Sequence, residues 1–359
     1  MAKEANKRGD LRQIFVTYRR CYKPTFMKLS LLLTHQHRLI SIAAILDVFD
    51  SVNHFYAVQE QPPFFDIELV LPDGEPLAQL QNYKHYPVVH VSDAANPDIV
   101  LIPAFVSGDM SQFLEANRGF IPWIKRQYQN KSEIASFCTG AFLLGATGLL
   151  NGKPATTHVM ACANFAAAFP EIVLQADKVL TAAEGIYTSG GATSTFHLLL
   201  FLIEKHCGRP MAVQTAKLFA IDMDRYTQAY FTIFIPDKRH TDDLITEVQK
   251  RMESGYKDAA TVEAFMEDIP SSRRNFVRRF KQATGITPIE YLQKTRIEAA
   301  KRLLEQTANS ILGVMLDCGY NDIKAFRKVF RKEVGLTPTA YRYKFSGGSK
   351  KATKEIVEA

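Results

Sequence analysis

The sequence predicts an α/β domain with a mostly parallel sheet and helices on both faces, followed by an all-α domain with two helix-turn-helix units. Three observations support this prediction. Strand and helix patterns alternate over about 200 residues. No strand pattern remains after residue 236, and residues 276–291 recur in similar form at 326–341. A chain of 359 residues is also long enough for two domains.

The first domain is predicted from strand-like runs separated by helix patterns. Val100, Leu101 and Ile102 follow one another without alternation, as in a parallel strand that is covered on both faces. Similar runs and a strand pair are separated by helix patterns, and together they predict a flavodoxin-like sheet within residues 25–235. The strand runs are 27–34, 64–72, 88–93, 97–105 and 132–138, the strand pair is 178–191, and the helix patterns are 39–53, 139–150 and 192–208.

The remaining segments differ in composition. Residues 1–24 are basic and lack periodicity, so we expect a flexible arm, and residues 236–242 form a polar linker. Residues 243–345 carry only helix patterns, and residues 346–359 form a Gly, Ser and Lys-rich tail that we expect to be disordered. The helices are expected near 242–256, 261–268, 272–284, 288–306, 310–318, 322–334 and 338–345.

The charge is distributed unevenly. Residues 237–359 contain 24 Lys and Arg against 17 Asp and Glu, whereas residues 1–236 contain 20 of each. The net charge of +7 therefore belongs to the last third of the chain. A neutral globular part joined to a basic part predicts that the basic part binds a polyanion.

Several protein classes are disfavoured. The five cysteines are odd in number and lack Cys-x-x-Cys spacing, which argues against a disulfide framework or a zinc module. The N-terminus has no apolar core of signal-peptide length, and the longest apolar stretch, 134–150, is too short and too broken to span a membrane. We expect a cytoplasmic protein without membrane association, metal or cofactor.

The repeat is the most informative feature of the sequence. FVRRFKQATGITPIEY at 276–291 matches FRKVFRKEVGLTPTAY at 326–341 with a constant offset of 50. Each copy has an inward-facing Phe pair, a separate basic stripe, a Gly suited to a left-handed C′ position and a Thr-Pro helix start. The stripes consist of Arg274, Arg278 and Lys281 in the first copy and Lys324, Lys328 and Arg331 in the second.

Two interpretations fit such a stripe: a solvated face of a helical bundle, or a DNA-reading helix. An isolated basic stripe favours the first. Here the stripe, the aromatic pair, the caps and the offset all recur together, which favours DNA. The helix from Pro288 to about Gln306 could hold the two basic helices in successive major grooves.

The segments RRFKQATGITPIEYLQKTRIEAAKRLLE and CGYNDIKAFRKVFRKEVGLTPTAYR resemble the AraC/XylS transcription factors over about 105 residues. The resemblance implies that helices 272–281 and 322–332 read DNA. It places Arg274, Arg278, Lys324, Arg327 and Lys328 near base edges and Arg279, Lys281, Arg331 and Lys332 near phosphates. The sequence EAFMEDIPSSRR lacks the small-residue turn that is usual in the family.

A cysteine stands at a strand-to-helix junction in the first domain. The run 134–142 places Cys138 where a nucleophile elbow would expose it, and His158 follows twenty residues later. A Cys/His pair could support nucleophilic chemistry. From spacing alone, a buried structural cysteine and a loop histidine are the favoured interpretation.

FCTGAFLLGATGLLNGKPATTH and IYTSGGATSTFHLLLFLIE resemble the DJ-1/PfpI branch of class I glutamine amidotransferase-like domains, over roughly residues 26–220. In this comparison Cys138 and His158 match catalytic positions, but Ser41 occupies the acidic one. Ala104 and Phe105 replace the glycines expected as oxyanion donors. The resemblance therefore implies a vestigial site used as a ligand pocket, lined by Cys138, His158 and Ser41, and no catalysis.

Together these features predict a transcriptional regulator whose α/β domain senses a small metabolite or mediates dimerisation. The expected partners are double-stranded promoter DNA, a small-molecule effector, a second copy of the chain and RNA polymerase. Two alternatives stay open: a cysteine-dependent amidase, protease or deglycase tethered to DNA, and a redox sensor acting through Cys138.

Overall fold

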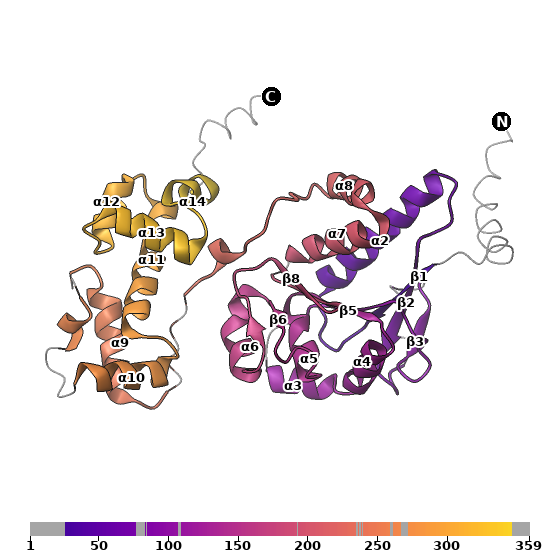
Figure 1. Ribbon diagram of the computed structural model, residues 1–359, viewed down its shortest axis with the longest axis horizontal. Helices are drawn as coiled ribbons and strands as arrows, with labels where there is room; N and C mark the ends of the chain where they lie inside the picture. Colours follow the sequence, from indigo (N-terminus) through magenta and orange to yellow (C-terminus); the bar gives the residue numbers. More distant parts are fainter. Residues whose placement is uncertain are drawn as a thin grey trace, which may run out of the picture. The chain divides into compact units, whose positions relative to one another are not determined.

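The computed structural model describes residues 26–76, 83, 85–106, 109–191, 193–234, 236, 238, 240–258, 261–266 and 272–346 (Figure 1). The predicted arm at 1–24, positions 235, 237 and 239 of the linker region and the tail beyond residue 346 lie outside the described residues. The chain divides into two compact units, Met1–Gln228 and Ala229–Ala359. We call them the α/β unit and the helical unit.

The α/β unit contains the predicted mostly parallel sheet. Seven strands lie in the order β3-β2-β1-β4-β5-β9-β8, and every neighbouring pair is parallel except the edge pair β8 and β9. The strands are β1 Met27–Leu32, β2 Phe65–Leu71, β3 Val88–His90, β4 Ile99–Ile102, β5 Glu133–Ser136, β8 Leu180–Ala183 and β9 Ile186–Ser189. All four residues of β4 are buried, as the unbroken apolar run predicts.

Helices cover both faces of this sheet (Figure 1). One face packs against α2 Leu39–Val58, α7 Ser194–Cys207 and α8 Arg209–Leu218. The other packs against α3 Met110–Ala116, α4 Phe120–Gln129, α5 Ala141–Ala146 and α6 Cys162–Ala168. A small second sheet, β6 Pro154–Ala155 with β7 Val173–Leu174, was not predicted from the sequence.

Helix α2 is long and apolar enough to cross a membrane by length and composition alone. It contributes Ile42, Ile45 and Phe49 to the core between the sheet and the helices α2, α7 and α8. A core helix with this composition passes the same test, and the packing of α2 is that of a core helix.

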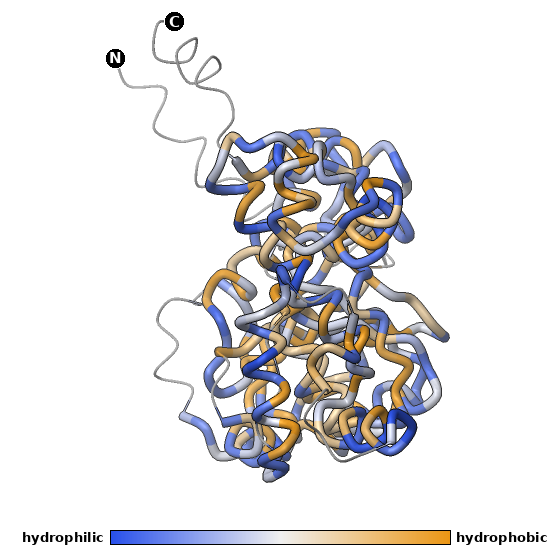
Figure 2. The backbone as a smooth tube through the Cα atoms, turned by 90° about the vertical axis from the view of Figure 1, so that its left-hand side faces the viewer, coloured by the Kyte–Doolittle hydropathy of each residue, from blue (hydrophilic) through white to orange (hydrophobic). Residues whose placement is uncertain are grey.

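The helical unit contains α9 Asp243–Gly255, α10 Arg273–Thr284, α11 Pro288–Gln306, α12 Ile311–Asp317, α13 Ile323–Val334 and α14 Pro338–Phe345. Hydrophobic and hydrophilic residues alternate along the chain (Figure 2), as expected when one face of each helix is buried. The predicted helix at 261–268 is described only as the short 3₁₀ turn η6, Glu263–Met266, and residues 267–271 lie outside the described part of the chain.

The change between units falls seven residues before the predicted boundary at 235/236. Residues 229–234, which we call the exit strap, carry aromatic side chains that pack with the helical unit. Tyr230 belongs to the cluster that contains Phe330 and Tyr341, and Phe234 packs against Tyr291. This packing assigns the strap to the helical unit.

Candidate DNA interface and candidate ligand site

The sequence repeat is also a repeat in three dimensions. The ring centroids of Phe276 and Phe280 lie 5.7 Å apart, and those of Phe326 and Phe330 lie 5.8 Å apart. A tyrosine from the following helix packs edge-on against the second Phe of each pair, at 5.4 Å for Tyr291 and 5.6 Å for Tyr341. The two copies therefore build their cores in the same way.

The ends of the two basic helices are equally alike. Gly285 and Gly335 end α10 and α13 with φ of 78° and 77°. These values lie in the left-handed region, where glycine carries no Cβ penalty. Thr287 and Thr337 then cap the next helices, and Thr287 forms a full capping box with Glu290.

Helix α11 joins the two copies through its buried side chains. Tyr291 and Leu292, near its start, belong to the core around α10, whereas Ile297, Ala300 and Leu304 belong to the core around α13. Its 19 residues span about 28 Å at about 1.5 Å per residue. The connector is thus part of both cores and fixes the separation of the two basic helices.

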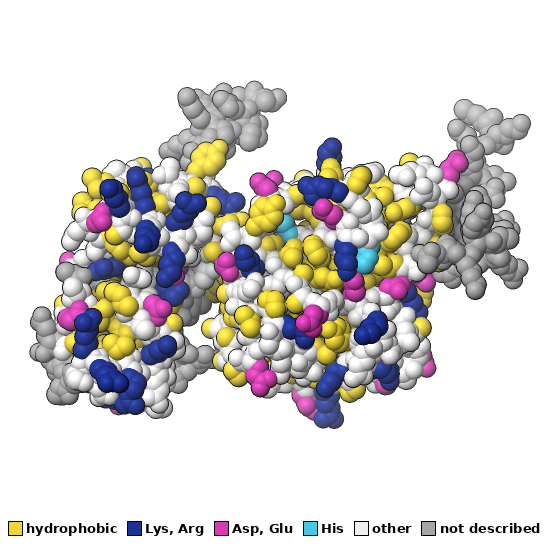
Figure 3. All heavy atoms as spheres, in the orientation of Figure 1, with side chains coloured by type: hydrophobic (Ala, Val, Ile, Leu, Met, Phe, Trp, Pro, Cys, Tyr) yellow, Lys and Arg dark blue, Asp and Glu magenta, His cyan; other side chains and the backbone are white. Residues whose placement is uncertain are grey.

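The predicted DNA-contacting side chains are all on α10 and α13. Lys and Arg side chains recur over the helical unit in the view of Figure 3. The predicted residues all lie in exposed positions, and they are Arg274, Arg278, Arg279, Lys281, Lys324, Arg327, Lys328, Arg331 and Lys332. An exposed cationic row on each of two duplicated helices is an electrostatic footprint of the kind that phosphate backbones require.

Two of these arginines make hydrogen bonds within the helical unit. Arg279 donates to both carboxylate oxygens of Asp242, at 2.5 and 2.9 Å, and Asp242 also caps α9. Arg278 donates to Asn275 one turn earlier on the same helix, at 3.1 Å. The Asp242 pairing ties α10 to the start of α9, an interaction that the sequence does not reveal.

Cys138 lies two residues after the end of β5, at the start of the 3₁₀ turn η3 (Cys138–Gly140). Its φ is 55°, which is unusual for a residue other than glycine and typical of a strained elbow. A Cβ at Gly140 would lie 2.6 Å from the carbonyl oxygen of Pro103, so only glycine fits there. The backbone of a nucleophile elbow is therefore present.

The chemical environment of Cys138 is that of a core residue. Only 2% of the side chain is exposed, and burial raises the pKa of the thiol to about 11, against the opposing effects of hydrogen bonds from Thr139 and the charge of Arg38. A thiol with this pKa is protonated at neutral pH, whereas the reactive nucleophile is the thiolate.

His158 makes its hydrogen bond to the backbone rather than to Cys138 in this arrangement. Its Nδ1 accepts a hydrogen bond from the backbone N–H of Met160 at 3.1 Å, and burial together with the charge of Arg38 lowers its pKa. Among the described residues, no hydrogen bond joins the imidazole to the Cys138 thiol. Thr157 connects the two segments, since its hydroxyl donates to the carbonyl oxygen of Cys138 at 2.9 Å.

The backbone donors beside the elbow are already used. The N–H of Ala104 donates to the Ser41 hydroxyl at 3.0 Å, and that of Phe105 donates to the Thr139 hydroxyl at 2.9 Å. The N–H of Cys138 points to the Ser189 hydroxyl at 3.4 Å. Ser41, at the position expected for the acid, is thus a buried acceptor. This arrangement leaves these three donors committed to side chains of the protein rather than to an oxyanion.

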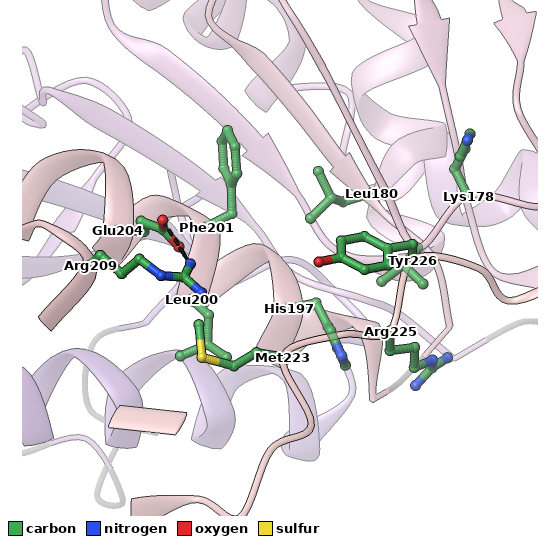
Figure 4. A pocket seen from close by; sticks show the side chains of 11 residues that line it. Lys178, Leu180, His197, Leu200, Phe201, Glu204, Arg209, Met223, Arg225 and Tyr226 are labelled. Carbon is green, nitrogen blue, oxygen red and sulfur yellow. Dashed lines mark hydrogen bonds and ion pairs between the residues drawn. The ribbon is translucent and has the colours of Figure 1, made fainter. Parts of the chain in front are cut away.

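A separate groove of about 400 Å³ lies between α7, β8 and residues 223–226 (Figure 4). Apolar side chains that include Leu180, Leu200, Phe201 and Met223 line it, and Lys178, Arg209 and Arg225 add positive charge. Arg209 is paired with Glu204 at 3.0 Å. The sequence does not reveal this groove, because one of its walls, residues 223–226, has no strand or helix pattern.

Gln228, which no sequence pattern marks, is buried behind the His158 segment. Its side-chain amide faces Thr156 and Thr157 on one side and Gly191 on the other. The only sequence signal was the adjacent pair Gly190-Gly191, whose small size leaves room for this side chain.

Comparisons with known proteins agree with both units. A helix-turn-helix domain model matches residues 267–344, and a DJ-1/PfpI family model matches residues 32–205. The HTH-type transcriptional regulator GbdR of Pseudomonas aeruginosa is 24% identical over 234 residues, which cover 65% of this chain and 64% of GbdR. The match thus spans slightly less than two thirds of that relative.

CdhR, another HTH-type transcriptional regulator of Pseudomonas aeruginosa, is 26% identical over 239 residues, covering 66% of this chain and 71% of CdhR. The crystal structure of an AraC family transcriptional regulator from Pseudomonas putida aligns with a TM-score of 0.44 and 13% identity, covering 54% of this chain and 98% of that one. The chain thus carries a DJ-1/PfpI match in its first unit and a helix-turn-helix match in its second, and its relatives GbdR and CdhR are HTH-type transcriptional regulators.

Proposed function

We propose that this protein binds specific promoter DNA through α10 and α13 and that its α/β unit senses a small metabolite. The observation that carries the DNA part is the duplicated geometry of the two basic helices, with matching Phe pairs, left-handed Gly ends and exposed cations on one connector. If the basic side chains only formed a solvated surface, the helix caps and the core packing would have no reason to recur with them.

The roles of the basic side chains follow from their positions on the helices. Arg274, Arg278, Lys324, Arg327 and Lys328 lie in the first two turns or the middle of their helices, where a reading helix approaches base edges. Arg279, Lys281, Arg331 and Lys332 are assigned to phosphates, which position the protein without specifying sequence. Arg279 would have to exchange Asp242 for a phosphate to play this role.

The α/β unit is proposed to bind its effector near Cys138, His158 and Ser41 without chemistry. The protonated thiol, the absence of a Cys138–His158 hydrogen bond among the described residues and the committed N–H donors all argue against an acyl-transfer enzyme. A ligand that prefers one geometry of this unit would shift the population of DNA-binding conformations.

The cellular setting is proposed from the relatives, which are transcriptional regulators. We place the protein in the cytoplasm, bound to promoter DNA as a homodimer formed through the α/β unit, where it meets RNA polymerase. Sedimentation of the full chain at several concentrations tests the dimer, and a monomer throughout the micromolar range would contradict it.

The DNA proposal is tested by selection of binding sites from random duplexes with the full chain. We expect the enriched duplexes to share two short sequence elements about one helical turn apart. The matched variant Arg278→Ala should lose sequence preference within one element only, and Lys328→Ala within the other. Enrichment without any shared sequence would refute specific promoter binding.

The effector proposal is tested by a thermal-shift screen of metabolites against the full chain, followed by binding to a selected duplex. A true effector should raise the unfolding temperature and change DNA affinity together, and Cys138→Ala should preserve the DNA response. Hydrolysis of any screened compound that disappears in Cys138→Ala would instead support the enzyme alternative.

A further inference from the structure

Gln228, the last residue of the α/β unit, has a buried side chain that joins three separate segments. Only 1% of the residue is exposed. Its Oε1 accepts from the N–H of Gly191 at 3.0 Å, and its backbone N–H donates to the carbonyl of Asp177 at 2.7 Å. Its Nε2 lies near three acceptors, the Thr156 hydroxyl at 3.2 Å and the carbonyls of Thr157 at 3.1 Å and Ala176 at 3.0 Å.

The cavity that holds this amide is shaped for it. A Cβ at Gly190 would lie 2.1 Å from the Gln228 Oε1, so a larger residue at 190 would displace the side chain. Both polar atoms of the amide have partners, and the buried group is fully satisfied within the protein. Gln228 is therefore held in one position by segments 156–157, 176–177 and 190–191.

Two of these segments border the candidate ligand site. Thr157, whose carbonyl accepts from Gln228, donates its hydroxyl to the carbonyl of Cys138. Gly191, whose N–H donates to Gln228, lies against His158, since a Cβ there would meet the imidazole Cδ2 at 3.3 Å. Thr157 therefore connects Gln228 to Cys138, and Gly191 connects it to His158.

The chain then continues directly into the exit strap, residues 229–234, which is part of the helical unit. Tyr230 is 7% exposed and packs in the core around α13. The buried amine of Lys301 on α11 donates to the carbonyl of Thr232 and pairs with Glu298 at 2.8 Å. Phe234 stacks edge-on against Tyr291, also on α11, with centroids 5.3 Å apart. The strap is thereby fastened to both halves of the connector.

We infer that Gln228 is a positioning residue that couples the Cys138–His158 site to the DNA-reading unit through the exit strap. Gln228 and the strap are consecutive in the chain, with Cα atoms about 3.8 Å apart, so a displacement of Gln228 displaces the point at which the strap begins. A movement of segments 156–158 or 190–191 would therefore shift Gln228 and the start of the strap that follows it. The meaning of this coupling as effector response depends on the proposed function, but the coupling itself does not.

The first test is hydrogen–deuterium exchange of the full chain with Gln228→Met, which keeps the size of the side chain and removes its amide. We expect exchange to rise about tenfold in segments 156–158 and 190–191 and also in the strap 229–234. The matched control is Gln127→Met, because Gln127 on α4 is equally buried and its Oε1 has no hydrogen-bond partner within the described residues. Its effect should remain near α4.

The second test runs in the opposite direction, because coupling between two sites is reciprocal. Tyr230→Ala loosens the strap and leaves Gln228 intact. We expect it to increase the alkylation rate of Cys138 by N-ethylmaleimide several-fold, measured on the Cys138 peptide by mass spectrometry. Tyr343→Ala, which removes a tyrosine that is 86% exposed on α14, is the control and should leave the rate unchanged.

The outcomes are distinct. If Gln228→Met changes exchange only within the α/β unit and Tyr230→Ala does not alter Cys138 alkylation, Gln228 is a structural residue of one unit and the inference fails. If Gln228→Met does not fold, the Tyr230→Ala result alone decides. Neither experiment uses an effector or DNA, so a failed effector screen or site selection leaves these results interpretable.

Discussion

Cys138 has the backbone of a nucleophile elbow and the surroundings of a core residue. Its positive φ persists although the carboxylate expected at position 41 is a serine. Gly140, which fits under the carbonyls of residues 102 and 103, keeps the turn tight whether or not the thiol reacts. The backbone geometry of an elbow therefore does not by itself make the thiol reactive, and the ionisation of the thiol is the property that distinguishes a reactive elbow from a buried one.

The pKa of Cys138 predicts the pH dependence of its alkylation. Because burial raises the pKa to about 11, the thiolate fraction is about 10⁻⁴ at pH 7 and grows about tenfold per pH unit up to pH 10. The rate of iodoacetamide labelling of the Cys138 peptide should follow this rise without a plateau. A plateau between pH 6 and 8 would instead indicate an activated thiolate and would revive the enzyme and redox-sensor alternatives.

Arg278 and Lys281 are predicted to contribute to DNA binding in different ways. Arg278→Ala should cost about 1–3 kcal/mol and relax sequence preference at one base position. Lys281→Ala should weaken binding to all sequences and lower the slope of log affinity against log salt by about one. Titrations of a selected duplex and a scrambled one at several salt concentrations measure both effects.

The control for this pair is Lys125→Ala, an exposed lysine on α4 of the α/β unit, which should change neither affinity nor salt slope. Arg279→Ala is expected to behave differently again, because it also removes the ion pair with Asp242 at the start of α9. If Arg278→Ala and Lys281→Ala have the same effect on all sequences, the division between base and phosphate contacts is wrong.

The helix ends of the repeat contribute to stability through backbone conformation. Gly285 ends α10 at φ 78°, and no atom lies within 4 Å of the position that a Cβ would take, so an alanine there meets strain and no clash. Gly285→Ala should therefore destabilise the helical unit by about 1–2 kcal/mol, the cost of placing an L-residue in the left-handed region. Urea unfolding followed by circular dichroism should show this shift.

The matched control is Gly119→Ala. Gly119 also has open space around its Cβ position, but its φ is −60°, which alanine adopts without strain. This substitution should be neutral or slightly stabilising because it restricts the unfolded chain. Equal destabilisation by the two substitutions would show that the left-handed conformation is not the cause.

Elements with a strong local pattern could be predicted from the sequence, and elements held by tertiary packing could not. The unbroken run at Val100 and the fifty-residue repeat specify a buried strand and two capped helices in almost any surroundings. Helix α3, with one buried residue, Phe113, and the two-residue strands β6 and β7 have too little periodicity to detect.

The residues of the candidate sites also fall into those that a local sequence pattern predicts and those that only tertiary packing reveals. The elbow cysteine and the basic stripes follow from spacing, which the sequence displays. The exit strap resembles an apolar linker in the sequence because its partners, Lys301 and Tyr291, lie more than fifty residues away. In the sequence Gln228 looks like any polar residue near a domain boundary. The reason for the Gly190-Gly191 pair becomes visible only in the structure, where the Gln228 amide lies beside it.

The basic excess of the chain and the rigid connector together determine how the helical unit can engage DNA. Lys294 on α11 pairs with Glu333 on α13 at 2.8 Å, and Tyr291 and Tyr341 donate to Glu253 and Glu305, which fixes the helices around the connector. A flexible tether would allow many spacings between two DNA elements. A connector that is buried in both cores allows one.

This rigidity predicts a strict dependence on the spacing of the two DNA elements. One turn of B-DNA advances about 34 Å, comparable to the length of about 28 Å of α11. Inserting 5 bp between the elements turns the second one by about half a turn to the far face of the duplex, and affinity should fall to that of a single element. Inserting 10 bp restores the face but adds a full turn of distance, which a rigid connector cannot bridge, so affinity should stay low. Gel-shift titration of selected duplexes measures this dependence of affinity on spacing.

The double variant Arg327→Ala/Lys328→Ala, which disables the second reading helix, should bind all spacings equally. Recovery of affinity at 10 bp would mean that the two readers separate in solution and that α11 does not set their distance.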